Sequence, residues 1–124
     1  MKFAQENLND GYVITAYDSG SIAINGKNFC RSLILQQTRL EQQWPVSDIG
    51  QLAATHIAQI LDFQPELVVI GTGEKLVFPV AEVYADLIRR GIGVEFMDTG
   101  AACRTYNILS GEGRNVVAGI ILPG

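Results

Sequence analysis

Residues 97–114 of the chain read MDTGAACRTYNILSGEGR, and the rest of the sequence can be placed around this stretch. The preceding residues 94–97 form a short apolar run, interrupted by Glu95, that is typical of a strand. Asp98 or Thr99 can then begin a helix, because a side-chain oxygen at its start accepts a hydrogen bond from a free backbone N–H group. The stretch therefore predicts a strand that leads directly into a capped helix.

The predicted helix continues with good helix formers, and Ala102, Tyr106 and Leu109 share one of its faces. Gly111 is expected to end this helix, since glycine adopts the left-handed conformation that often follows a helix. Residues 116–122 are then a continuous apolar run rich in valine and isoleucine, which predicts a buried strand.

A second unit of strand and helix precedes this one. Residues 67–70 are a continuous apolar run that suits a buried parallel strand, and residues 71–75 (GTGEK) form a loop. Pro79 suits a first helical position, and residues 80–90 carry an amphipathic apolar stripe. Gly91 is expected to stop this helix.

The opening of the chain predicts antiparallel strands. Residues 12–17 and 21–24 alternate around Asp-Ser-Gly, which is the pattern of a hairpin, and Asn-Gly at 25–26 predicts another tight turn. Residues 31–36 are expected to add a third strand to this meander.

The middle of the chain predicts a loop and then a helix. Residues 36–43 are polar, and Trp44 is followed by a proline that favours extended backbone. Ser47 or Asp48 is expected to cap a single amphipathic helix over residues 49–61.

These elements predict an α/β fold. We expect one three-layer domain over residues 1–124, because domains of roughly 100–200 residues are usual. An N-terminal antiparallel β-meander would be followed by β-α-β-α-β units on a mixed central sheet, with right-handed crossovers.

Composition supports an ordered chain, since hydrophobic residues make up 48% and charged residues 18%. The net charge of −4 opposes non-specific binding to nucleic acid, so no nucleic-acid partner is expected. No apolar run approaches the roughly 18 residues of a membrane-spanning helix. The composition predicts no particular oligomeric state.

The cysteines and the N-terminal residues favour the cytoplasm. Cys30 and Cys103 form no CxxC motif, and two buried thiols are expected rather than one disulfide. Residues 1–11 carry Lys2 together with Glu6 and Asp10, which is the pattern of neither a signal peptide nor a transit peptide.

Several short motifs, in order and spacing, make nearly the whole chain resemble the Mth-type domain family of unknown function. The matching residues are Val69-Ile70-Gly71-Thr72-Gly73, Asp98-Thr99 with Ala102, Thr105, Asn107 and Leu109, Glu112-Gly113-Arg114, and Trp44. That family includes a mitochondrial complex I assembly factor and an adipogenesis-associated protein. The resemblance implies a mixed sheet between layers and a protein-binding or assembly role.

The candidate ligand site lies where two parallel strands end. In open α/β sheets, ligands bind beyond the carboxyl ends of such strands, and helix N-termini there attract anions. The site would take a small anion or nucleotide, and the alternative is that these residues only form turns and a helix cap. Its candidate residues are Gly71, Thr72, Gly73, Asp98, Thr99 and Arg104.

No complete catalytic constellation is recognisable, so no catalytic residue is predicted. Cys103 near a helix start is either an activated nucleophile or, the interpretation we favour, a small packing residue. The single histidine, His56, would have to meet Cys103 from another helix. No metal site is expected from one histidine and two cysteines, and no cofactor is expected because Gly71-Thr72-Gly73 lacks the remainder of a nucleotide-binding fingerprint.

Other residues have two interpretations each. Glu74-Lys75 is a catalytic pair or solvated turn charge, and Glu112 with Arg114 fixes a turn or contacts a partner. Trp44 packs over the core or anchors a partner. Two functions follow: a non-enzymatic binding or assembly module, which we favour, and a protein or enzyme that uses the crevice for a small anionic ligand.

Overall fold

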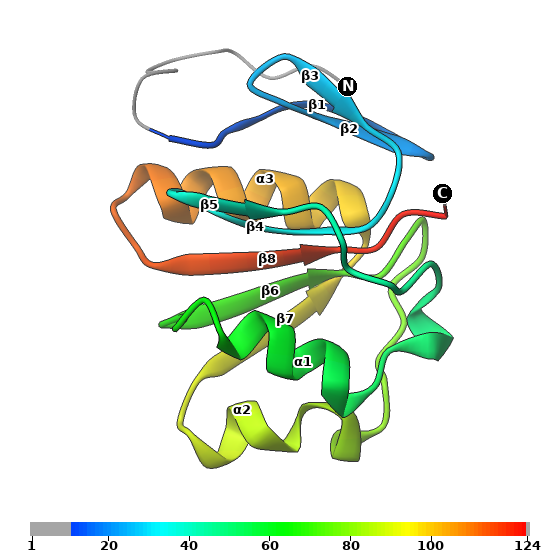
Figure 1. The fold of residues 1–124 in the computed structure, drawn as a ribbon, viewed down its shortest axis with the longest axis vertical. Helices are drawn as coiled ribbons and strands as arrows, with labels where there is room; N and C mark the ends of the chain where they lie inside the picture. The colour runs from blue at the N-terminus through cyan, green and yellow to red at the C-terminus, as the bar shows by residue number, and fades with distance from the viewer. Residues whose placement is uncertain (1–10, 124) are drawn as a thin grey trace.

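A five-stranded mixed sheet forms the centre of the molecule in the computed structural model, which describes residues 11–123 (Figure 1). Strand β6 (Leu67–Gly71) lies between β7 (Gly93–Met97) and β8 (Val116–Ile120) and is parallel to both. Strand β8 also pairs antiparallel with β4 (Leu33–Gln36), which pairs antiparallel with β5 (Arg39–Glu41). The predicted α/β fold with a mixed central sheet is therefore confirmed.

Helices cover both faces of this sheet (Figure 1). Helices α1 (Ala54–Leu61) and α2 (Ala85–Arg89) pack on one face, and α3 (Thr99–Gly111) packs on the other. The chain moves outward from β6 to β7 through α2 and returns to β8 through α3. Because both crossovers favour the same hand, opposite directions of travel place the two helices on opposite faces.

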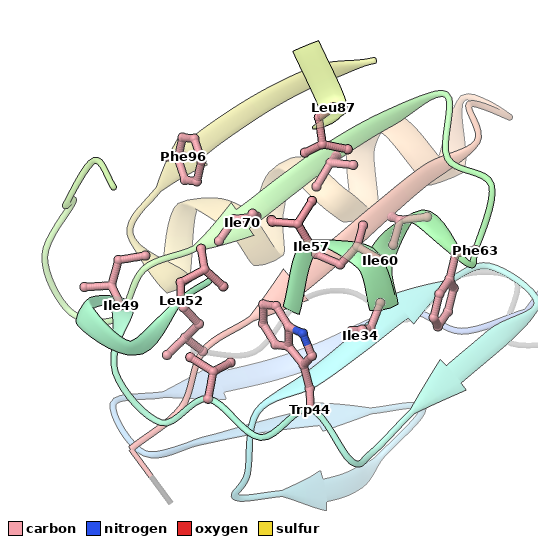
Figure 2. Close-up of a cluster of buried hydrophobic side chains, with 14 residues drawn as sticks. Ile34, Trp44, Ile49, Leu52, Ile57, Ile60, Phe63, Ile70, Leu87 and Phe96 are labelled. Carbon is pink, nitrogen blue, oxygen red and sulfur yellow. The ribbon is translucent and has the colours of Figure 1, made fainter. Parts of the chain in front are cut away.

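The core under α1 and α2 is built on Trp44 (Figure 2). Its indole is 3% exposed, and its Nε1 donates a hydrogen bond to the carbonyl of His56 at 3.2 Å. A Cβ added at Gly119 would lie only 2.7 Å from Trp44 Cη2, so the ring packs directly on strand β8. The packing interpretation of Trp44 is confirmed.

A small second sheet covers the outer side of α3 (Figure 1). It consists of β1 (Ile14–Asp18), β2 (Ser21–Ile24) and β3 (Lys27–Phe29), all antiparallel. The predicted hairpin is confirmed as β1 and β2. Positive φ angles of 49° at Asn25 and 85° at Gly26 allow the tight turn into β3.

The meander differs from the prediction in its third strand. The strand expected at residues 31–36 forms as β4, but it pairs with β8 in the central sheet, and β3 completes the meander instead. Strand β5 also lies inside residues 36–43, which were expected to be a loop. Strands of three residues are too short to show an alternating pattern in the sequence.

The helix expected at residues 49–61 is divided. Asp48 caps a single 3-10 turn, η2 (Ile49–Gln51), by accepting a hydrogen bond from the N–H of Gly50. Leu52 is then extended, with φ −63° and ψ 127°, and α1 begins only at Ala54. Gly50 lies within the 3-10 turn, and glycine weakens a helix, which is consistent with this break.

The helix expected at residues 80–90 is shorter than predicted. A 3-10 turn, η3 (Ala81–Tyr84), precedes α2, and Pro79 lies before the cap residue Val80 rather than in the helix. Gly91 follows α2 with a φ of 70°, as expected.

The structure also corrects the predictions for the end of α3 and for the burial of Cys30. Gly111 remains helical, and Gly113 adopts the left-handed conformation with a φ of 82°. The N–H of Arg114 donates to the carbonyl of Leu109, which completes the helix-ending motif. Cys30 is exposed rather than buried. The expectation for the N-terminal residues concerns positions 1–11, of which 1–10 lie outside the described residues.

Candidate functional site

The ends of β6 and β7 bring the two predicted loops together. The N–H of Thr72 donates to the carbonyl of Met97 at 2.8 Å, and the N–H of Thr99 donates to the carbonyl of Gly73 at 2.8 Å. These bonds follow from the parallel pairing of the two strands, which end side by side at Gly71 and Met97.

Thr99 ties three chain segments together at this point. Its side-chain Oγ1 accepts a hydrogen bond from the N–H of Gly73 at 3.0 Å and donates to the carbonyl of Ile121 at 3.4 Å. The residue is 7% exposed. Its hydroxyl therefore joins the loop after β6 to the segment after β8.

Thr72 organises the loop in the same way. It is 5% exposed, and its Oγ1 donates to the carbonyl of Lys75 at 2.6 Å while accepting from the N–H of Val77 at 3.2 Å. Both threonine hydroxyls thus stabilise the local backbone. This agrees with the alternative interpretation, in which the candidate residues have a structural role only.

Four of the six candidate residues line one pocket of about 380 Å³: Gly73, Asp98, Thr99 and Arg104. Asp98 caps α3, with Oδ1 accepting from the N–H of Ala101 at 2.9 Å. Thr72 instead lines an adjoining pocket of about 510 Å³ that shares Gly73 with the first.

Gly71 has a packing role. A Cβ at this position would lie 3.1 Å from the Cβ of Ala102 and 3.1 Å from the Cα of Thr99. The missing side chain therefore lets α3 approach β6 closely. Gly73 differs, because its φ of 109° requires a glycine-like backbone while no atom lies within 4 Å of an added Cβ.

The hairpin between β1 and β2 supplies a wall of the pocket that the sequence did not predict. Tyr17, Asp18 and Ser19 line it opposite the start of α3. The ring of Tyr17 lies against Gly100, where an added Cβ would approach Cε2 within 2.7 Å. No local motif marks these residues, since only the packing of the small sheet on α3 brings them here.

Arg104 is held beside this wall. Its Nη1 donates to Tyr17 Oη at 2.6 Å, and its guanidinium lies 5.9 Å from the centre of the Tyr17 ring. The arginine is exposed and lines the pocket, and its guanidinium has further N–H donors besides the one bonded to Tyr17.

Carboxylates outnumber cations around the pocket. Asp18, Glu74 and Asp98 line it with Arg104 as the one cation among its lining residues. Asp18 accepts a hydrogen bond from the N–H of Ser19, and Asp98 neutralises the start of α3. An anionic ligand would therefore depend on the guanidinium of Arg104 for its attraction.

Cys103 and His56 lie on opposite faces of the central sheet and form no pair. Burial raises the pKa of the Cys103 thiol from 9.0 to about 12, an effect that Arg104 reduces and Asp98 increases. The activated-nucleophile interpretation is therefore wrong, because burial outweighs the helix start. His56 Nδ1 accepts from the N–H of Ala53 at 3.0 Å at the start of α1.

The remaining candidates have local partners or are exposed. Arg114 lies 3.4 Å from Glu66 rather than pairing with Glu112, and its N–H helps to end α3. Glu74 and Lys75 are exposed in the loop. Within residues 11–123, no group of three or more His, Cys, Asp or Glu side chains is arranged to hold a metal ion.

Known proteins similar to this chain agree with the fold. Residues 14–121 match the family described as "Protein of unknown function (DUF498/DUF598)". A solved structure from Bordetella pertussis, described as a Mth938-like domain, has 28% identity and a TM-score of 0.82, covering 100% of this chain and 94% of that one. The predicted resemblance to the Mth-type family is thereby confirmed.

Two relatives carry names that bear on function. The "13 kDa major membrane protein" of Francisella tularensis is 35% identical over 98% of this chain and 99% of its own length. NADH dehydrogenase (ubiquinone) 1 alpha subcomplex assembly factor 3 of Danio rerio is 35% identical over 96% of this chain and 69% of its own length. Among the described residues of this chain, no helix has the length and apolar character needed to cross a bilayer.

Proposed function

This chain belongs to the DUF498/DUF598 family of proteins of unknown function, and we propose that it is a non-enzymatic protein-binding module that assists the assembly of a multi-subunit enzyme. One observation carries the proposal: nearly the whole chain aligns with relatives named as NADH dehydrogenase assembly factors. An assembly factor needs a stable surface that recognises a subunit, and it needs no catalytic group.

The chemistry of the described residues supports a binding role. The only histidine, His56, is bonded at the start of α1, while the Cys103 thiol is buried on the other side of the sheet. The two threonine hydroxyls at the strand ends are already bonded to the backbone. The Cys103 thiol therefore has no histidine beside it, and the hydroxyls of Thr72 and Thr99 are engaged in structural hydrogen bonds.

The cytoplasm is part of this proposal. Cys30 and Cys103 are free thiols, which suits a reducing compartment. Fractionation of the host cells, with the chain detected by antibody, tests the location. Recovery in washed membranes alone would contradict it.

Deletion of the gene tests the assembly role. We expect less assembled NADH dehydrogenase on native gels of membrane extracts, with subunits accumulating in partial complexes. A plasmid copy of the wild-type chain should restore the assembled enzyme. An unchanged amount of assembled NADH dehydrogenase in the deletion strain would overturn the proposal.

A small anionic ligand in the pocket beside Arg104 is the second candidate function. The observation that favours it is the exposed Arg104 among the residues that line a pocket of about 380 Å³. The candidate residues are Gly71, Thr72, Gly73, Asp98, Thr99 and Arg104. A thermal-shift screen with phosphate, nucleotides and carboxylates tests it, because a ligand of the native state raises its stability.

Arg104→Ala separates the two functions. The assembly role predicts that this variant restores NADH dehydrogenase as well as the wild type does. The ligand role predicts that a thermal shift seen with the wild type disappears in Arg104→Ala. Arg90→Ala is the matched control, since Arg90 is an exposed arginine outside the residues that line this pocket.

A further inference from the structure

Large apolar side chains are exposed mainly in one short segment. Among residues 11–123, six large hydrophobic residues are exposed, and four of them lie within residues 76–80. Phe78 is 69% exposed and Val80 is 65% exposed. The six are Leu76, Val77, Phe78, Val80, Ile88 and Ile108. Single exposed apolar residues are ordinary, but a run of them marks an interaction surface.

The base of this loop is held in one conformation. The hydroxyl of Thr72 bonds the carbonyl of Lys75 and the N–H of Val77, so the chain is fixed immediately before Phe78. A segment that is ordered before binding loses less conformational entropy when a partner arrives.

The exposed loop is continuous with the edge of the central sheet. The ring of Phe78 meets the ring of Phe96 with centres 6.2 Å apart, and Phe96 lies on β7. Strand β7 is the last strand of the sheet and pairs only with β6 among the described residues (Figure 1). We call Leu76, Val77, Phe78, Val80 and the open edge of β7 the apolar edge.

Carboxylates surround the apolar edge. Glu74 and Glu82 flank the exposed loop in sequence, and Glu95 lies at the middle of β7, where the alternation of a strand turns its side chain to the face opposite Phe96 and Phe78. All three are exposed, and none enters an ion pair among residues 11–123. Lys75 is the one cation within the loop, and the whole chain carries a net charge of −4.

We propose that the apolar edge binds an extended, apolar segment of a protein partner that carries Lys or Arg residues, paired as an additional strand beside β7. Backbone hydrogen bonds to β7 would supply affinity, apolar side chains would cover Phe78 and Val80, and basic side chains would meet the glutamates. The inference rests on the proposed function, because it names the surface and partner class of that binding module.

The same charges oppose two other occupants. A second copy paired symmetrically about the middle of β7 would place Glu95 opposite Glu95, and like charges directly opposite are destabilising. An anionic lipid surface that met the loop would be repelled by Glu74 and Glu82, the two glutamates that flank it. A basic protein segment is the occupant that fits both the apolar residues and the charge.

The test measures binding of a synthetic peptide to the full chain by fluorescence anisotropy. The fluorescein-labelled peptide alternates valine and isoleucine with threonine and lysine, and a second peptide has glutamate in place of each lysine. We expect the lysine peptide to bind. Phe78→Ser should weaken it by about tenfold, because aromatic anchors dominate such interfaces.

Matched variants isolate the surface. Ile108→Ser should leave binding unchanged, since Ile108 is 61% exposed but lies on α3, on the other face of the sheet. Glu95→Lys should weaken the lysine peptide and favour the glutamate peptide, whereas Glu112→Lys at the far end of α3 should change neither. Circular dichroism checks that each variant is folded, which the exposure of Phe78 leads us to expect.

Four results would overturn the inference: no binding of the lysine peptide, equal weakening by Ile108→Ser, a dimer in sedimentation that Phe78→Ser abolishes, or Phe78-dependent binding to vesicles of phosphatidylcholine and phosphatidylglycerol.

The proposed function fails separately. If Phe78→Ser restores NADH dehydrogenase assembly fully in the deletion strain, the surface is wrong and the assembly role stands. If the peptide binds as described but deletion leaves assembly unchanged, the surface stands and the assembly role is wrong.

Discussion

The side chain of Asn107 bonds both backbone groups of Ile14. Its Oδ1 accepts from the N–H of Ile14 at 3.0 Å, and its Nδ2 donates to the carbonyl of Ile14 at 2.7 Å. The carboxamide thus acts as a strand partner would, and it joins α3 to the first strand of the small sheet. Tyr106 reinforces the junction by donating its hydroxyl to the carbonyl of Tyr12 at 2.9 Å.

Asn107→Ala is expected to destabilise the protein. The variant leaves the N–H and the carbonyl of Ile14 without their side-chain partner, and an unsatisfied buried polar group costs about 1–3 kcal/mol. Urea denaturation measures the free energy of unfolding. Asn28→Ala is the control, because Asn28 is exposed on β3, and it should change stability little. Equal stability of Asn107→Ala and the wild type would contradict this account of the junction.

Gly71→Ala is expected to be destabilising by about 1–3 kcal/mol, as is usual for an overpacked core. The new Cβ would lie 3.1 Å from Ala102 and from Thr99, so α3 would have to move away from β6. Gly93→Ala in the neighbouring strand is the matched control, since no atom lies within 4 Å of its added Cβ. Thermal unfolding measures the stability of both variants. If Gly71→Ala and Gly93→Ala lose the same stability, close packing does not explain the need for glycine at position 71.

Gly111 and Gly113 should respond to alanine with opposite signs. Gly111 is helical with open space around it, so Gly111→Ala is expected to stabilise the protein by about 1 kcal/mol through helix propensity. Gly113 has a φ of 82°, and an L side chain there is strained, so Gly113→Ala should destabilise by about 1 kcal/mol. The denaturant midpoints of the two variants measure these changes in stability. A loss of stability in Gly111→Ala would mean that α3 ends at Gly111, as the sequence alone suggested.

Stability is expected to fall at alkaline pH because of Cys103. Burial raises the pKa of its thiol from 9.0 in the unfolded chain to about 12, so the folded state binds more protons than the unfolded state between these values. The stabilisation is complete below pH 9 and is lost as pH rises towards 12. Tyr106 acts in the same direction, since burial raises its pKa from 10.0 to about 12.

Urea denaturation from about pH 8 to about pH 11, with reductant present, follows this dependence from below the unfolded thiol's pKa of 9.0 towards the folded value of about 12. Cys103→Ala should show a smaller alkaline loss than the wild type, although it starts from lower stability. Cys30→Ala should keep the full loss, because Cys30 is exposed. An identical pH dependence in Cys103→Ala and the wild type would contradict the prediction.

The strands and the long helix of the second half were predictable from local patterns. The apolar runs of β6 and β8 and the cap at Asp98 depend on neighbours within a few residues, and the structure confirms each of them. The division of residues 49–61 was missed, since their apolar spacing is compatible with one helix although Leu52 is extended. The end of α3 was missed because either glycine could adopt the required conformation.

The candidate site was predictable in one part only. Gly73 and Asp98 follow the ends of two strands, and such ends form a crevice when the two strands are parallel neighbours. Four of the six candidate residues do line one pocket. Its other wall comes from Tyr17, which meets Arg104 across a separation of 87 residues. Local spacing carries no information about such a pair.

The amino-acid sequence by itself thus determined the class of fold, the parallel strands and the capped helix. Helix caps, apolar periodicity and apolar runs all depend on residues that are near neighbours in the chain. Packing between distant segments decided the rest. The meander lies on α3 through a shared apolar cluster and through Asn107, which meets Ile14 across 93 residues. Leu76, Val77, Phe78 and Val80 remain exposed near β7, the last strand of the sheet, and only the assembled sheet has an edge.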